Sequence, residues 1–150
     1  MHSFIVTNWN LDLQALPSLL ADFPSLHHPD VLLVEPNPTI GITQIRHLKV
    51  WLSRKPYQAP SKLALLLQAH TLTLPAQHAL LQSLEEPPPQ AIIILSTSYP
   101  DRLLATIHSR CQVINLHHSD ILASIIPPTI PDQIGERLAH HVGAQVGLDS

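Results

Sequence analysis

Five short aliphatic runs recur along the chain, and they contain too few polar residues to alternate between an apolar and a polar face. They are the segments 4–7, 31–34, 63–67, 91–95 and 113–116. Continuous Ile, Val and Leu runs of this length are typical of strands buried on both faces, as in a parallel sheet covered by helices. The pattern predicts a five-stranded parallel sheet.

Between these runs, apolar residues recur at the spacing of amphipathic helices. One predicted helix ends near Lys55-Pro56 and has its apolar stripe at Ile42, Ile45, Leu48 and Leu52. Another has Thr73 as N-cap, Pro75 in its first turn and Pro87 as its stop, with its stripe at Ala76, Leu80, Leu81 and Leu84.

Two further helices are predicted, and the one that starts at Pro100 is expected to be the shorter. One lies between Leu11 and Phe23, where Pro17 should kink or split it. The other starts at Pro100 and directs three apolar residues inward, at Leu103, Leu104 and Ile107. Strand and helix alternate throughout, which predicts a three-layer α/β fold with right-handed crossovers.

After residue 116 the pattern changes, and two short helices are predicted between residues 119 and 150. The second has an apolar stripe at Ile130, Ile134, Leu138 and Val142. We therefore expect a core over residues 1–118, followed by a small helical appendage over residues 119–150.

Composition narrows the function classes. The chain of 150 residues is 45% hydrophobic and only 4% aromatic, so one aliphatic core is expected. A formal net charge of −3 gives no electrostatic basis for binding a phosphate backbone unaided. With no basic leader and no long apolar run, we expect a soluble protein without a membrane anchor.

Cysteine and histidine usage does not favour a metal site. Cys111 is the single cysteine, so no internal disulfide or CxxC zinc site exists, and a reducing cytoplasmic compartment fits. Histidines occur in adjacent pairs at 27–28, 117–118 and 140–141. Adjacent residues on a strand point to opposite faces, so we predict no metal site at these pairs.

Four segments carry a resemblance to a known family. They are HPDVLLVEP (28–36), IGITQIRHLKVWLSRKPY (40–57), LPAQHALLQSLEEPP (74–88) and RLLATIHSRCQ (102–112). In content and order they resemble the clamp-loader ATPases of the AAA+ class, in particular the delta prime subunits of bacterial DNA polymerase III. The resemblance implies a P-loop NTPase-like fold, with residues 119–150 as a remnant of the lid domain.

The sequence differs from the family at the positions that bind ATP and magnesium in its relatives. Where ATP-binding relatives have a glycine-rich phosphate loop with a lysine, this chain has Asn8, Trp9 and Asn10. Where they have two magnesium-binding acids, it has Leu67 and Gln68. The four glycines (Gly41, Gly135, Gly143 and Gly147) form no alternative loop. These departures predict a protein without a nucleotide cofactor and without ATPase activity.

Trp9 has three interpretations. It could plug the space that ATP occupies in relatives, stack on a nucleic-acid base, or anchor an interface, and we favour the plug. Thr97 stands where the family has a polar sensor at the end of the fourth strand. In this chain its hydroxyl could instead satisfy a strand end.

The resemblance assigns one positive role. In the family, the arginine matching Arg110 of the Ser109-Arg110-Cys111 motif reaches the ATP of the next subunit as an arginine finger. The alternative is a solvated arginine that favours the helix dipole. Cys111 is expected to pack in the interior. Glu85 and Glu86 are adjacent on a helix and do not face each other, which disfavours an acid/base pair and leaves a helix-end or interface role.

The resemblance implies a noncatalytic subunit that partners the clamp-loader gamma/tau and delta subunits and, through them, the sliding clamp and primed DNA. On this resemblance, we expect the chain to lack the zinc-binding insertion and the C-terminal collar of the family. The alternative is a standalone scaffold derived from such an ATPase, binding another partner through the helix of Leu80 and Leu84 or through the apolar tail.

Overall fold

The computed structural model describes residues 2–116, which form a parallel sheet between helices. The strands are β1 (Ser3–Thr7), β2 (Val31–Val34), β3 (Lys62–Leu67), β4 (Ala91–Ser96) and β5 (Gln112–Asn115). Every strand pair is parallel, and the order across the sheet is β2-β3-β4-β1-β5. The predicted five-stranded parallel sheet is confirmed, with strand ends shifted by at most one residue.

The register of the sheet divides its side chains between two apolar clusters, one on each face, where composition predicted one core. Ile5 of β1 lies opposite Leu95 of β4 and Val113 of β5. Ile5 and Leu95 belong to one apolar cluster, whereas Phe4 and Ile94, one position earlier on the same strands, belong to the other. This alternation explains why the strands are apolar at nearly every position.

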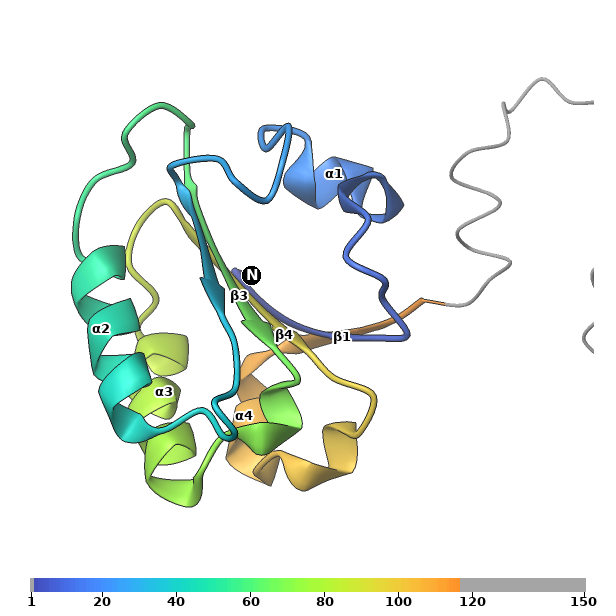
Figure 1. The fold of residues 1–150 in the computed structure, drawn as a ribbon, viewed down its shortest axis with the longest axis vertical. Helices are drawn as coiled ribbons and strands as arrows, with labels where there is room; N and C mark the ends of the chain where they lie inside the picture. Colours follow the sequence, from blue (N-terminus) through green and yellow to red (C-terminus); the bar gives the residue numbers. More distant parts are fainter. Residues whose placement is uncertain (1, 117–150) are drawn as a thin grey trace, which may run out of the picture. The chain divides into compact units, whose positions relative to one another are not determined.

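Three helices cover one face of the sheet: α2 (Ile42–Leu52), α3 (Leu74–Glu85) and α4 (Ala105–Arg110) (Figure 1). The expected stripe residues Ile45, Leu48 and Leu80 are fully buried in this core. The Thr73 hydroxyl accepts a hydrogen bond from the Ala76 N–H, which begins α3 as predicted. These helices therefore follow from the sequence period.

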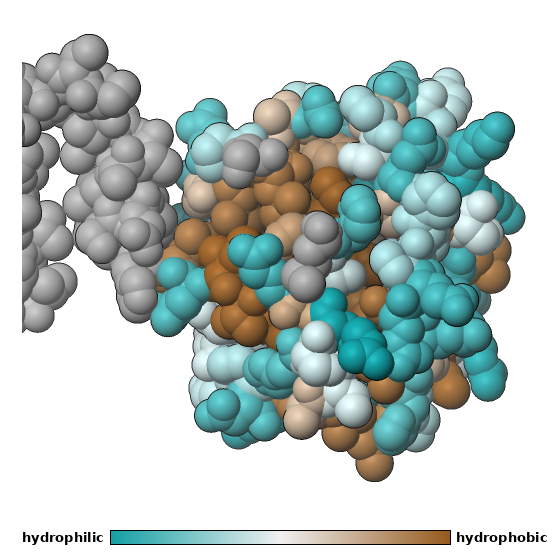
Figure 2. Space-filling view, turned by 180° about the vertical axis from the view of Figure 1, so that it is seen from behind, coloured by the Kyte–Doolittle hydropathy of each residue, from teal (hydrophilic) through white to brown (hydrophobic). Residues whose placement is uncertain are grey.

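The opposite face has a thinner cover. It consists of a 3-10 turn (Leu13–Ala15) and α1 (Pro17–Leu20), in which Pro17 takes the first helical position. The predicted helix is thus split at Pro17, as expected. Partly exposed apolar side chains remain on this face, and apolar surface gathers on the α1 side in the reverse view (Figure 2).

The predicted start of the fourth helix at Pro100 is wrong. A 3-10 turn (Pro100–Arg102) comes first, the backbone then extends at Leu103 (φ −92°, ψ 148°), and α4 begins only at Ala105. The reason is buried Gln77, whose Oε1 accepts the Leu104 N–H at 2.8 Å. This long-range bond satisfies a backbone donor outside any helix.

Within residues 2–116, no helix is long and apolar enough to cross a membrane. The predicted appendage over residues 119–150 lies outside the described residues, as do its apolar stripe, the histidine pairs at 117–118 and 140–141, and three of the four glycines. The division at residue 118 stays a prediction.

Candidate functional site

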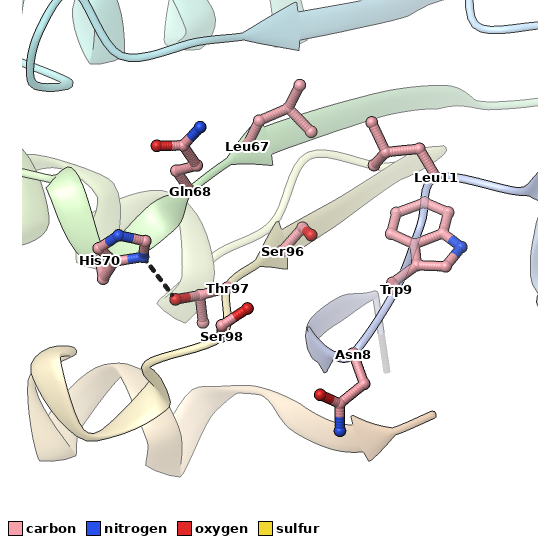
Figure 3. A pocket seen from close by; sticks show the side chains of 9 residues that line it. All are labelled: Asn8, Trp9, Leu11, Leu67, Gln68, His70, Ser96, Thr97 and Ser98. Atoms are coloured by element: carbon pink, nitrogen blue, oxygen red, sulfur yellow. Dashed lines mark hydrogen bonds between the residues drawn. The ribbon is translucent and has the colours of Figure 1, made fainter. Parts of the chain in front are cut away.

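A hollow of about 240 Å³ lies at the carboxyl ends of β1, β3 and β4 (Figure 3). In open parallel sheets, this is the edge at which ligands bind. The sheet brings together three sets of predicted site residues here: Asn8 and Trp9 after β1, Leu67 and Gln68 at β3, and Thr97 after β4. Asn10 does not line the hollow.

The loop after β1 is held by side chains. Asn8 and Leu11 have left-handed backbones (φ 60° and 66°) although neither is glycine. The Asn8 amide donates to Asn115 Oδ1 at 2.7 Å, and the Trp9 indole N–H donates to the Asp12 carbonyl at 2.9 Å. The ring of Trp9 forms part of the wall and leaves the hollow open beside it. The loop therefore contains no lysine that could pair with a phosphate group.

The segment at the end of β3 has no carboxylate that could bind magnesium. Leu67 is the last residue of β3, and Gln68 follows with a left-handed backbone (φ 48°) that turns the chain into a 3-10 turn (Ala69–Thr71). Both residues line the hollow. An apolar side chain and a neutral amide are poor partners for a divalent cation.

Sequence reasoning missed His70, which lies beside Thr97. The His70 Nδ1 is 2.8 Å from the Thr97 hydroxyl, and that hydroxyl also accepts the Tyr99 N–H at 3.0 Å. Burial and, secondarily, the charge of Arg102 lower the pKa of His70, which favours a neutral imidazole near pH 7. Thr97 therefore has partners within its own chain, and no sequence spacing indicated the contact.

The hollow lacks the charges that nucleotide chemistry uses. Among the described residues that line it, none is Lys, Arg, Asp or Glu. Across residues 2–116, no three His, Cys, Asp or Glu side chains converge in an arrangement that could hold a metal ion. The arrangement can offer hydrogen bonds and apolar contacts to a small molecule.

Arg110 lies at the opposite edge of the sheet. It is the last residue of α4, and β5 begins two residues later, so it stands at the amino ends of the parallel strands. β5 is four residues long, which places roughly 13 Å between the two edges. The structure thus brings the hollow residues together and separates them from Arg110.

The neighbours of Arg110 in the motif have different environments. Ser109 is exposed, and its hydroxyl donates to the Thr106 carbonyl at 2.8 Å. Cys111 is buried, and burial raises the pKa of its thiol to about 12. A thiol with this pKa is protonated near neutral pH, so Cys111 is a packing residue.

Sequence reasoning also missed the partner of Arg110. Its Nη2 lies 3.2 Å from Oε2 of Glu85, the last residue of α3. The signal in the sequence was an acid at the carboxyl end of a predicted helix, where the helix dipole disfavours negative charge. The adjacent Glu86 has no ion-pair partner among the described residues.

The strand order, the helical layers and the ligand edge define a P-loop NTPase-type α/β module. The sequence profile of the family described as "DNA polymerase III, delta subunit" matches residues 20–120. The chain belongs to this family. Its resemblance to the delta prime subunits is confirmed by relatives that carry that name.

Two of these relatives show the extent of the likeness. The DNA polymerase III subunit delta' of Haemophilus influenzae is 38% identical over 91 residues, covering 59% of this chain and 28% of the relative. The subunit delta' of Pseudomonas aeruginosa is 33% identical over 116 residues, covering 74% and 35%. The chain thus spans about a third of the length of these relatives.

A solved structure supports the fold. The crystal structure of a DNA polymerase III gamma subunit-related protein from Thermotoga maritima matches with a TM-score of 0.65 and 27% identity. The match covers 89% of this chain and 44% of the other. The predicted fold class is therefore confirmed.

Proposed function

We propose that the chain is a noncatalytic, delta-prime-like subunit of the DNA polymerase III clamp loader, which supports loading of the sliding clamp in DNA replication. In this proposal it supplies Arg110 in trans to ATP held by a neighbouring subunit. The observation that carries the proposal is the separation of the two sites. Arg110 is about half-exposed at one sheet edge, whereas the hollow lies at the other.

Three features support a noncatalytic role. The loop after β1 has no lysine to pair with a phosphate, and the end of β3 has leucine and glutamine where magnesium needs oxygen anions. Lowering of the His70 pKa also keeps the hollow uncharged near neutral pH. None of these groups can replace the charges that stabilise phosphoryl transfer.

The relatives support the proposed partners. Proteins named delta', tau and gamma/tau of DNA polymerase III all match this chain. We therefore place the chain beside gamma/tau and delta subunits, with the clamp and primed DNA contacted through them. The standalone scaffold is the rival, and co-purification with clamp-loader subunits separates the two.

The noncatalytic part is tested by calorimetric titration of the purified chain with Mg-ATP. A flat titration is expected, because the hollow has neither a cation for the phosphates nor an acid for magnesium. Two outcomes would show an active nucleotide site. One is a Kd near 1 μM, which corresponds to roughly −8 kcal/mol of binding free energy. The other is ATP turnover that survives repurification of the protein.

The trans-acting part is tested by ATPase assays of the reconstituted assembly with clamp and primed DNA. Arg110→Ala is expected to lower turnover, by roughly 10³-fold to 10⁵-fold if it is the sole trans-acting group at its site and by less where several such arginines act. Arg110→Lys should rescue little, because lysine keeps the charge but loses the planar fork. Arg102→Ala, which removes another exposed arginine, is the matched control. Unchanged turnover in an Arg110→Ala assembly of normal composition would favour the scaffold.

A further inference from the structure

Glu85 and Arg110 form an ion pair that joins the ends of two helices. Arg110 Nη2 lies 3.2 Å from Glu85 Oε2, and the side chains are 45% and 46% exposed. The helices α3 and α4 that carry them pack together, and Leu84 of α3 and Ile107 of α4 belong to the same buried apolar cluster. The pair therefore joins two packed helices, and its side chains are accessible to a neighbouring molecule.

The position of Glu85 is electrostatically unfavourable for its own helix. It is the last residue of α3, where the helix dipole disfavours an acid, whereas Arg110 at the end of α4 is favoured. An exposed ion pair contributes little to stability. Stabilisation of the fold is thus a weak reason for a carboxylate at this place, and orientation of the guanidinium is a stronger one.

The contact leaves most of the guanidinium available. Arginine has five N–H donors, and the Glu85 contact uses one of them. A second, long contact of 3.4 Å joins Nη1 to the Ser109 hydroxyl. The carboxylate therefore holds one side of the fork while other donors remain for phosphate oxygens.

We infer that Glu85 is a positioning residue for Arg110, holding its guanidinium ready for the phosphates of a nucleotide on a neighbouring subunit. This inference rests on the trans-acting role proposed above for Arg110. A long side chain must lose rotamer freedom to act, and a partner that fixes it in advance reduces that cost in the assembled complex. The carboxylate itself contacts no reacting atom.

The test uses the reconstituted assembly of this chain with gamma/tau and delta subunits, clamp and primed DNA. Glu85→Gln is expected to lower kcat by roughly threefold to tenfold and to change the KM for ATP less than twofold, because the arginine acts in the transition state. Glu86→Gln removes the same charge at the same helix end and should change kcat less than twofold. Combining Glu85→Gln with Arg110→Ala should be no worse than Arg110→Ala alone.

A second variant and a stability measurement separate positioning from support of the fold. Glu85→Asp keeps the charge but withdraws it by one methylene, which lengthens the 3.2 Å contact, so kcat should fall at least threefold. Thermal unfolding of Glu85→Gln should shift by less than about 4 °C, since the pair is exposed.

The failures of the two proposals are distinguishable. If Arg110→Ala lowers turnover while Glu85→Gln and Glu85→Asp both match Glu86→Gln, the positioning role is wrong and the trans-acting arginine stands. If Arg110→Ala changes nothing, both proposals are wrong. A Glu85→Gln variant that loses kcat only in proportion to lost folded protein also overturns the positioning role.

Discussion

At the residue scale, Asp30 shows how a motif residue acts through backbone contacts. It is 1% exposed, and its carboxylate accepts the N–H groups of Tyr57, Gln58 and Ala59 at 2.6 to 2.7 Å. Burial alone would raise the pKa of Asp30, but these three donors and the nearby His28 outweigh it and lower the pKa from 3.8. The carboxylate thus fixes the loop that leads into β3.

Asp30→Asn is expected to lower the free energy of unfolding at pH 7 by about 3 kcal/mol. An amide has one acceptor oxygen instead of two, and its NH₂ would face a backbone donor, so charge-assisted bonds are lost. Urea unfolding measures the change, with Asp22→Asn, at an exposed acid, as control. A loss no larger than that of Asp22→Asn would contradict this role.

The same carboxylate predicts an acid dependence. Because the folded pKa lies below the unfolded value, the stabilisation is complete above the unfolded pKa and is lost as pH falls through the folded one. The difference between wild type and Asp30→Asn should therefore narrow as urea unfolding is repeated from pH 6 toward pH 2. A difference that stays constant over this range would be inconsistent with a lowered pKa.

At the element scale, α3 depends on its first turn. The Thr73 hydroxyl accepts the Ala76 N–H at 3.2 Å, and Gln77 in the next turn satisfies the backbone before α4. Thr73→Ala should lower the free energy of unfolding by about 1 kcal/mol, and Thr73→Ser should retain most of it. Thr106→Ala, at an exposed position of α4, is the control in the same urea experiments. Equal effects of the two alanine variants would refute the cap.

The elements that the sequence predicted correctly are those governed by local pattern. The strand around Leu65 and the helix around Leu80 follow from apolar period, and α3 begins at a cap whose residues are three apart. The break before α4 depends on Gln77, 27 positions from Leu104 in the chain. A local period contains no information on such a contact, so the helix was predicted to start too early.

The candidate site also combines features that the sequence predicted with contacts that it did not. The resemblance assigned nucleotide motifs to Asn8, Trp9, Asn10, Leu67, Gln68 and Thr97. The parallel strands bring all of these except Asn10 to one edge, because each lies at or just after the end of a strand. The contacts that decide their chemistry are between distant side chains. His70 and Thr97 are 27 positions apart, and Glu85 and Arg110 are 25 apart. Only the packing of the helices and strands creates these pairs.

At the scale of the whole molecule, charge is unevenly distributed along the sequence. No Asp or Glu occurs between Glu35 and Glu85, a stretch that contains Arg46, Lys49, Arg54, Lys55 and Lys62. Lys62 is buried, where its ammonium donates to the Trp51 carbonyl and burial lowers its pKa. The other four lie on or just after α2 at partly or fully exposed positions.

This distribution leads to a prediction for DNA. The net charge of −3 opposes approach to a polyanion, and only four basic side chains are grouped outside the core. The isolated chain should therefore bind primed or duplex DNA with a Kd on the order of 10⁻⁴ M or weaker at physiological salt. Fluorescence anisotropy measures this Kd.

The salt dependence of binding tests the role of the four basic residues. If they make at most four phosphate contacts, raising the salt from 50 to 150 mM should lower the affinity about fiftyfold. Arg54→Gln with Lys55→Gln should reduce that salt slope, and Arg102→Gln, outside the α2 group, should not. Submicromolar binding at 150 mM salt would contradict the prediction, because it would require more cationic surface than residues 36–84 provide. DNA contact would then be an activity of this chain itself instead of one reached through its partner subunits.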